Sequence, residues 1–298
     1  MLDINILKIS ADEMAANKKV QQEFEQVGNF NQDEHVNTFD GCEPVDETFD
    51  YYKRGFVNRI KHWFYTSALK IYQRNVNRDL TNLKIVGQEN LRGLKGGYIV
   101  TCNHISKVDS FAVRAAIPHK IKFVAADFNN WKGILGDISR HTGYLPICTR
   151  KTSLSMTRKF NQALEYFLNH NWPILIYPEQ ALWTDYKKPR PLKRGAFHYA
   201  AKFRKPVLPL FITIQDKPAA IDAQGRANYG DYTIHILPPI YPDSDLDDRA
   251  NTDKMIIANF CAWRDCYEQT YGQPLTYDIV DPGAVDSQVK VFLDAIKN

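Results

Sequence analysis

The sequence predicts an α/β protein built on a single mixed sheet flanked by helices. Short apolar runs rich in β-branched residues are typical of buried strands, and they recur at residues 83–86, 97–102, 121–125, 145–148, 174–177, 207–213 and 232–237. Segments with apolar residues at helical spacing lie between or after them, at residues 109–117, 153–169, 194–203, 251–270 and 284–297. Strands that alternate with helices of this length indicate a sheet covered on both faces.

The chain divides by charge into an acidic N-terminal extension and a basic body. Residues 1–50 hold three Lys/Arg against twelve Asp/Glu, whereas the remaining residues hold 35 against 22. We expect the extension to form a short helix near residues 11–24 and irregular segments. Because no Pro/Gly/Ser-rich linker interrupts residues 51–298, we expect one domain there.

The basic body indicates an anionic partner, and three interpretations compete. The first is a plain solvated surface, and the second is nucleic acid. No recognisable nucleic-acid module or interleaved Gly/aromatic motif is present, which argues against the second. The third is an anionic lipid surface or a phosphorylated substrate.

Residues 55–79 predict an amphipathic basic helix. Aromatic and aliphatic residues recur at helical spacing, and cations stand between them. One interpretation is a helix packed on its own core. The other is a helix lying in a membrane interface, with aromatics among the headgroups and cations on anionic lipid.

The cysteine pattern and the N-terminus predict a cytoplasmic protein. Five cysteines occur with no C-x-x-C pair, so a disulfide framework is not expected. The N-terminus lacks a basic region followed by a long apolar core, and no run approaches the 18 or so apolar residues of a membrane-spanning helix. We therefore predict a cytoplasmic protein that sits peripherally on the inner face of the membrane.

His104 and Asp109 follow the strand predicted at residues 97–102, at the edge where ligands bind in α/β sheets. A five-residue spacing suits a turn that folds the carboxylate back toward the imidazole. A His held this way presents its other ring nitrogen as a general base. No nucleophile elbow accompanies the pair, so the nucleophile would belong to the substrate, such as an alcohol. The alternative is a capping Asp beside an incidental His, and a metal site lacks a third ligand.

Two later strand ends also carry polar residues. The strand at residues 145–148 leads to Arg150 beside a predicted helix start, which indicates either a phosphate site or a solvated loop. The strand at residues 174–177 leads to Glu179 and then to a basic stretch that includes Lys193 and Arg194. Polar groups at successive strand ends are what an α/β active site requires.

These segments, in this order, resemble the glycerolipid acyltransferase family. Asn103-His104-x4-Asp109 matches the family's first block, and Gly143 to Arg150 is similar to its second with one extra residue. Tyr177-Pro178-Glu179 resembles the Phe-Pro-Glu of the third block. Lys193-Arg194-Gly195-Ala196-Phe197 resembles the Lys-x-Gly-Ala-Phe that follows, and Lys205 to Leu210 is similar to the fourth block. The resemblance covers about residues 80–215.

The resemblance implies transfer of a fatty acyl group from a thioester donor, acyl-CoA or an acyl-carrier protein, to a lysophospholipid hydroxyl. It makes 1-acylglycerol-3-phosphate the expected acceptor and an anionic membrane surface the expected partner, with no metal, no other cofactor and no nucleic acid. His104 and Asp109 would be catalytic. The substrate-binding residues would be Asn103, Arg150, Glu179, Lys193, Arg194 and Gly195.

One departure concerns the acceptor. The family's third block continues Gly-Thr-Arg-Ser, whereas this chain has Gln180, Ala181, Leu182 and Trp183. Leu182 cannot bind phosphate as the family's Arg is implied to do, so Arg190, Lys188 or Lys193 would have to substitute. Alternatively, the acceptor is another lysolipid or an amino-lipid, or the chain is a membrane lipid-binding protein without catalysis.

Overall fold

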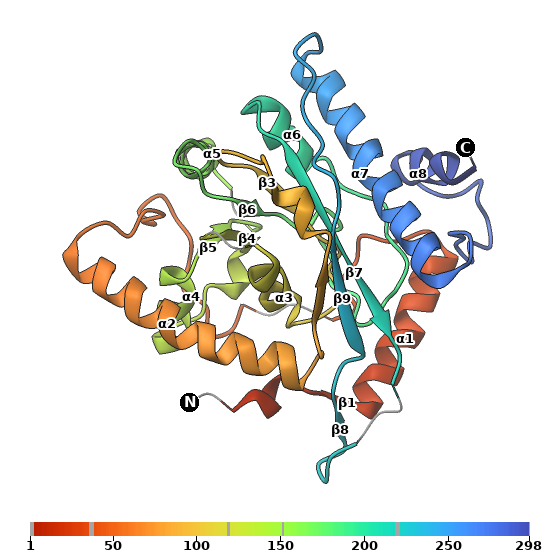
Figure 1. Ribbon diagram of the computed structural model, residues 1–298, viewed down its shortest axis with the longest axis horizontal. Helices are drawn as coiled ribbons and strands as arrows, with labels where there is room; N and C mark the ends of the chain where they lie inside the picture. Colours follow the sequence, from red (N-terminus) through yellow and green to blue (C-terminus); the bar gives the residue numbers. More distant parts are fainter. Residues whose placement is uncertain (1–2, 36–38, 118–119, 151, 218–220, 298) are drawn as a thin grey trace.

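The computed structural model describes residues 3–35, 39–117, 120–150, 152–217 and 221–297. As the sequence predicts, one mixed seven-stranded sheet forms the centre, in the order β2-β9-β7-β3-β6-β4-β5 (Figure 1). Its strands are β2 (Lys84–Val86), β9 (Asp231–Ile236), β7 (Val207–Gln215), β3 (Ile99–Thr101), β6 (Ile174–Leu175), β4 (Lys122–Ala126) and β5 (Tyr144–Ile147). The five strands from β7 to β5 are parallel, so their carboxyl ends share one edge.

Helices cover both faces of this sheet. On one face lie α3 (Asp109–Ala116) and the end of α2 (Phe56–Asp79), packed on Val100, Leu210 and Ile212. On the other lie α5 (Leu154–Asn169), α6 (Gly195–Lys202), α7 (Asp248–Tyr271) and α8 (Ser287–Lys297), packed on Ile99, Val207 and Phe211. Alternate residues of β7 therefore supply two separate cores, as the pleat of a strand requires.

Side-chain caps begin several of these helices. The Ser153 hydroxyl accepts a hydrogen bond from the Met156 N–H at 3.1 Å, and the Asp247 carboxylate accepts one from the Ala250 N–H at 2.7 Å. Each cap satisfies an N–H group that would otherwise have no partner in the first turn. At the end of α7, Gly272 adopts the left-handed conformation with φ 66°, which glycine reaches at little cost.

Some elements differ from the sequence prediction. A further helix, α4 (Gly133–His141), lies beside α2 (Figure 1). Its two glycines lower its helix propensity, and Ile134 and Leu135 are exposed, so it lacks the usual inward apolar stripe. The strand predicted over residues 174–177 ends at Leu175, although the Ile176 N–H still donates to the Val100 carbonyl of β3 at 2.9 Å. A two-residue ladder between β1 (Ile9–Ser10) and β8 (Arg226–Ala227) was also not predicted.

The remaining elements belong to the first half of the chain. They are α1 (Ala11–Gln26) and the 3₁₀ turns η1 (Ile4–Leu7), η2 (Gln88–Leu91) and η3 (Asp127–Asn129). Within the described ranges, every helix is too short or too polar to serve as a membrane-crossing segment. No disulfide joins the five cysteines.

A third apolar cluster joins the N-terminal extension to the body. Phe30 is fully buried and stacks on Trp183, with ring centroids 5.9 Å apart. The rings of Phe30 and Tyr277 meet edge to face, with centroids 4.9 Å apart. Val285 and Val289 complete the cluster. The extension is thus fixed to the segment that follows β6.

We predict that Phe30→Ala lowers the free energy of unfolding by about 3–5 kcal/mol, because it removes a fully buried ring and leaves a cavity. Chemical denaturation monitored by tryptophan fluorescence measures the change. Val27→Ala, at a side chain that is 67% exposed, is the control and should shift the free energy by less than about 0.5 kcal/mol. Equal losses in both variants would contradict the prediction.

Candidate active site

His104 lies in the loop that follows β3, and its backbone is held on both sides. Its N–H donates to Glu179 Oε2 at 3.0 Å. Its carbonyl oxygen accepts from the Trp183 N–H at 3.2 Å and from Arg190 Nη2 at 3.3 Å. The segment after β6 therefore determines where the imidazole stands at the carboxyl edge of the sheet.

The imidazole forms a close pair with Asp109, the first residue of α3. His104 Nδ1 lies 2.7 Å from Asp109 Oδ2, so the turn expected from the five-residue spacing is present. The same oxygen accepts from the N–H groups of Ile105 at 3.0 Å and Ser106 at 3.2 Å. Asp109 is buried, whereas the His104 side chain is 25% exposed. With Nδ1 donating to the carboxylate, Nε2 is the ring nitrogen left to accept a proton.

Tyr177 contacts both His104 and Asp109, a role that the sequence pattern does not predict. Its ring stacks on the imidazole, with centroids 4.1 Å apart and planes inclined by 16°. Its hydroxyl donates to Asp109 Oδ1 at 2.6 Å. Burial, together with the neighbouring Asp109 charge, raises the pKa of the Tyr177 hydroxyl, which therefore stays protonated as a donor. The only signal in the sequence was a Tyr where the resembled block has Phe.

Glu179 and Arg190 form a buried ion pair behind His104. Glu179 Oε2 lies 2.7 Å from Arg190 Nη2, and Oε1 accepts from the Arg190 N–H at 2.9 Å. The guanidinium also donates to the Ala181 carbonyl at 2.5 Å and lies 4.7 Å from the Trp183 ring. Arg190 is only 1% exposed, so it cannot substitute for a phosphate-binding arginine. The cation that Glu179 holds is Arg190 itself.

Asn103 is buried, so its side chain is not exposed at the surface of the site. Its Nδ2 donates to the Ile212 carbonyl at 2.9 Å, and its Oδ1 accepts from the Ile212 N–H at 2.8 Å. The amide thus pairs with β7 in the way a strand neighbour would. These contacts make Asn103 a link between the loop after β3 and β7, and they leave its predicted substrate contact as a prediction.

The other predicted binding residues are engaged elsewhere. The Arg150 guanidinium lies 3.5 Å from the Phe39 ring centroid, and its Nε is 3.9 Å from Asp127 Oδ2. Lys193 Nζ is 3.4 Å from Gln288 Oε1, and Arg194 pairs with Asp253 of α7. Gly195 begins α6. The described contacts of these four residues do not include His104 or Asp109.

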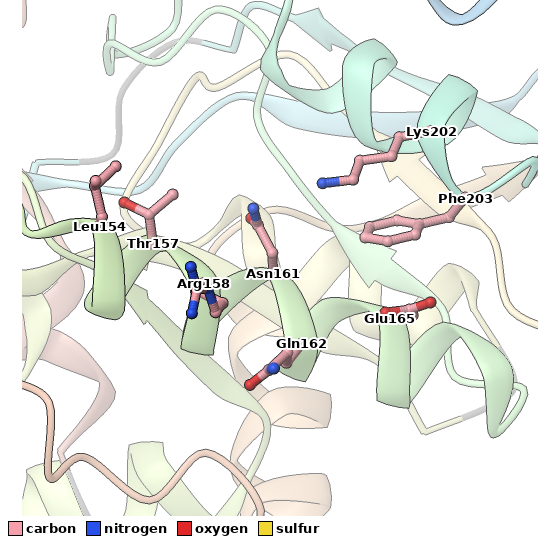
Figure 2. Close-up of a pocket in the computed structure, with 8 residues that line it drawn as sticks. All are labelled: Leu154, Thr157, Arg158, Asn161, Gln162, Glu165, Lys202 and Phe203. Carbon is pink, nitrogen blue, oxygen red and sulfur yellow. The ribbon is translucent and has the colours of Figure 1, made fainter.

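A surface groove of about 510 Å³ lies between α5 and α6 (Figure 2). Arg158, Asn161 and Glu165 line it from α5, and Lys202 and Phe203 line it from the end of α6. None of its lining residues is a predicted site residue. Among the residues that the structure describes, no group of three His, Cys, Asp or Glu side chains is placed to hold a metal.

Comparison with known proteins finds a family to which the residues around the site are similar. Residues 82–213 match the acyltransferase family model, a span that contains His104, Asp109, Tyr177 and Glu179. These residues are therefore similar to the acyltransferase family. The family resemblance that the four sequence blocks predict is therefore confirmed.

Curated relatives are distant acyltransferases. The 1-acyl-sn-glycerol-3-phosphate acyltransferase of Saccharomyces cerevisiae is 26% identical over 171 residues, which cover 56% of this chain and 54% of that protein. The chloroplastic enzyme BAT2 of Brassica napus, which bears the same activity name, is 25% identical over 194 residues, covering 65% and 53%. The chain spans about half the length of these relatives.

The fold also matches a solved acyltransferase. The crystal structure of the 1-acyl-sn-glycerophosphate acyltransferase from Thermotoga maritima superposes with a TM-score of 0.51 at 15% identity, over 76% of this chain and 87% of that one. At this identity the likeness establishes a shared fold.

Asp185 lies next to the site, where its N–H donates to the Ile105 carbonyl at 2.9 Å, and its carboxyl group affects stability. Burial raises the pKa of Asp185 to about 7, although the Tyr232 hydroxyl donates to its Oδ1 at 3.2 Å. The folded state therefore keeps a proton that the unfolded chain releases near pH 4, and stability falls as pH rises from about 4 to about 7. Asp185 has φ 57°, a conformation that Asn adopts readily.

We therefore expect Asp185→Asn to raise the free energy of unfolding by about 1–2 kcal/mol at pH 8, because no buried carboxylate then ionises. At pH 4 the variant and the wild type should agree. Urea denaturation at the two pH values measures the difference. A variant less stable than the wild type at pH 8 would refute the assignment.

Proposed function

We propose that the chain transfers a fatty acyl group from a thioester to the hydroxyl of a lysolipid. The observation that carries this proposal is the His104 imidazole, with Nδ1 held by a buried carboxylate and Nε2 left as the proton acceptor. No side-chain nucleophile is needed when the substrate supplies the hydroxyl. The match of residues 82–213 to the acyltransferase family model supports acyl transfer as the chemistry.

The proposed reaction is a direct transfer without an acyl-enzyme. His104 Nε2 removes the proton of the acceptor hydroxyl as its oxygen bonds to the thioester carbonyl carbon. Asp109 stabilises the imidazolium that forms and keeps the ring in its orientation. Collapse of the tetrahedral intermediate breaks the C–S bond, and the imidazolium proton passes to the departing thiolate. Ester and free thiol are the products.

The acceptor has two candidates. The names of the curated relatives point to 1-acylglycerol-3-phosphate, which would yield phosphatidic acid. Burial of Arg190 instead favours a different lysolipid or an amino-lipid, because no arginine replaces Leu182 at the surface of the loop. A non-catalytic lipid-binding protein is the remaining alternative, and loss of turnover in a His104 variant separates it from an enzyme.

We propose that α2 places the site against an anionic membrane. Five of its large apolar side chains face solvent instead of a core: Phe56, Ile60, Trp63, Phe64 and Ile71 are 52–76% exposed. Ile134 and Leu135 of the neighbouring α4, with Trp131 just before it, are exposed too. An apolar surface of this kind flanked by cations is typical of interfacial helices. Arg59, Lys70 and Arg74 are exposed on α2 and have no ion-pair partner in the described structure.

We expect His104→Ala to lower turnover by at least about 10²-fold, because the general base is lost. Thiol release from a long-chain acyl-CoA and from an acyl-carrier protein, each with a panel of lysolipids, measures it. His170→Ala is the matched control, since this exposed His directly follows α5 and its Nδ1 lies 2.7 Å from the Tyr166 carbonyl oxygen. Full activity of His104→Ala would sink the mechanism.

Vesicle binding tests the α2 surface. The wild type should sediment with anionic vesicles and bind more weakly as salt rises, since the cations are screened. Trp63→Ala combined with Phe64→Ala should weaken binding by about tenfold or more, because two large apolar groups no longer leave water. Leu154→Ala, at an exposed residue of α5, is the control. Equal binding to neutral and anionic vesicles would refute the electrostatic part.

A further inference from the structure

A cluster of cations lies at the amino edge of the sheet, opposite the edge that carries His104. It consists of Arg114, from the last turn of α3, together with Lys120 and Lys122, and we call it the amino-edge cluster. Lys122 is the first residue of β4, whereas His104 lies in the loop after β3, and both strands run parallel to β6. The cluster and the candidate active site are therefore separate places on the protein.

Lys122 is buried without an acidic partner. It is only 8% exposed, and its Nζ lies 4.2 Å from the Phe167 ring centroid and 4.8 Å from the Trp172 ring centroid. Ring faces attract a cation, but they do not replace the oxygen acceptors that three N–H groups require. Within the described ranges, the ammonium of Lys122 has no hydrogen bond and no ion pair. A buried charge in this condition is unfavourable until an anion joins it.

The charged groups that act on Lys122 are cations as well. Lys120 is exposed, and its Nζ lies 5.7 Å from the centroid of the same Trp172 ring. Arg114 Nη2 donates to the Thr142 carbonyl at 2.7 Å, which is an uncharged acceptor. Burial, and then repulsion by Arg114 and Lys120, lowers the pKa of Lys122 to about 8. At neutral pH the cluster therefore carries three positive charges, and none has a carboxylate partner among the described residues.

The amino-edge cluster lies beside α2. Lys120 and Lys122 are close enough to His62 of α2 to lower its pKa, although burial of the imidazole has the larger effect. The two residues after His62, Trp63 and Phe64, are 70% and 58% exposed, and they belong to the surface that we propose to enter a membrane interface. A helix lying in that interface would therefore bring the cluster close to the phosphate groups of the lipid headgroups.

We propose that Lys120 and Lys122 bind a phosphate group at this edge of the sheet, with Arg114 adding to the positive field. Lysine ammonium groups bind phosphate through charge-assisted hydrogen bonds, and two of them stand here at one indole ring. A phosphate also supplies the negative charge that the cluster lacks, so its binding offsets the mutual repulsion of the cations. The headgroup of an anionic lipid and free phosphate share this chemistry. The site is independent of acyl transfer at His104.

The test uses the full chain and both sources of phosphate. Sedimentation with phosphatidylcholine vesicles, with and without phosphatidic acid, measures binding to the lipid. The midpoint of thermal unfolding in inorganic phosphate, compared with chloride at equal ionic strength, measures binding of the free anion. Lys120→Gln combined with Lys122→Gln should weaken binding to the phosphatidic acid vesicles at least about tenfold, because two cations near the lipid are lost. The same variant should lose most of the rise in midpoint that phosphate causes in the wild type.

Lys18→Gln combined with Lys19→Gln is the matched control, because it removes two exposed cations of α1 and changes the net charge equally. It should behave like the wild type in both measurements. Should the double variant at the cluster fail to fold, Lys120→Gln alone carries the test, with an expected loss of vesicle binding of about threefold.

The outcomes separate the two sources of phosphate. A loss in one measurement only supports the site and identifies the lipid or the free anion as its ligand. A cluster variant that matches the Lys18 and Lys19 control in both measurements would overturn the inference. If the wild type binds neither kind of vesicle, the proposal for α2 fails, and the unfolding midpoint in phosphate still decides this site.

Discussion

The buried carboxylate of Asp109 is the group on which the site depends. It sits at the N-terminus of α3, where backbone N–H groups and the helix dipole favour negative charge. Four donors converge on it: the His104 ring, the N–H groups of Ile105 and Ser106, and the Tyr177 hydroxyl. A buried charge without such partners would be strongly unfavourable. The same bonds that make the carboxylate tolerable also fix the loop and orient the imidazole.

The ion pair between Glu179 and Arg190 holds the backbone of His104 in place, and Asp109 holds its imidazole ring. Both groups contact the main chain of His104, one at the N–H and the other at the carbonyl. Arg190 also donates to the Phe30 carbonyl, so the N-terminal extension, the loop after β6 and the loop that carries His104 meet at one guanidinium. Buried ion pairs contribute little net stability compared with apolar residues, and their value lies more in geometry. Here that geometry places three distant segments around one imidazole.

The chain has two basic stretches, one on α2 and one after Glu179, and their cations are paired to different extents. Lys187, Lys188 and Arg194, after Glu179, are neutralised by acidic residues from the extension or from later parts of the chain. The cations Arg59, Lys70 and Arg74 on α2 stand beside exposed aromatic side chains instead. The positive charge of the sequence therefore has two different surroundings. After Glu179 these cations are paired within the protein, whereas on α2 they lie on an exposed surface.

The sequence by itself determined the fold class, most strand and helix positions, and the His104–Asp109 contact. These follow from local periodicity, or from a turn only five residues long, which a linear pattern can encode. The tertiary structure decided the rest. The Tyr177 hydroxyl on Asp109, the burial of Arg190, the pairing of Asn103 with Ile212 and the carboxylates of Asp33 and Glu34 on the loop after β6 join residues 11 to 150 positions apart. Such contacts leave no periodic signal, because they exist only once the strands have assembled and brought their carboxyl ends to one edge.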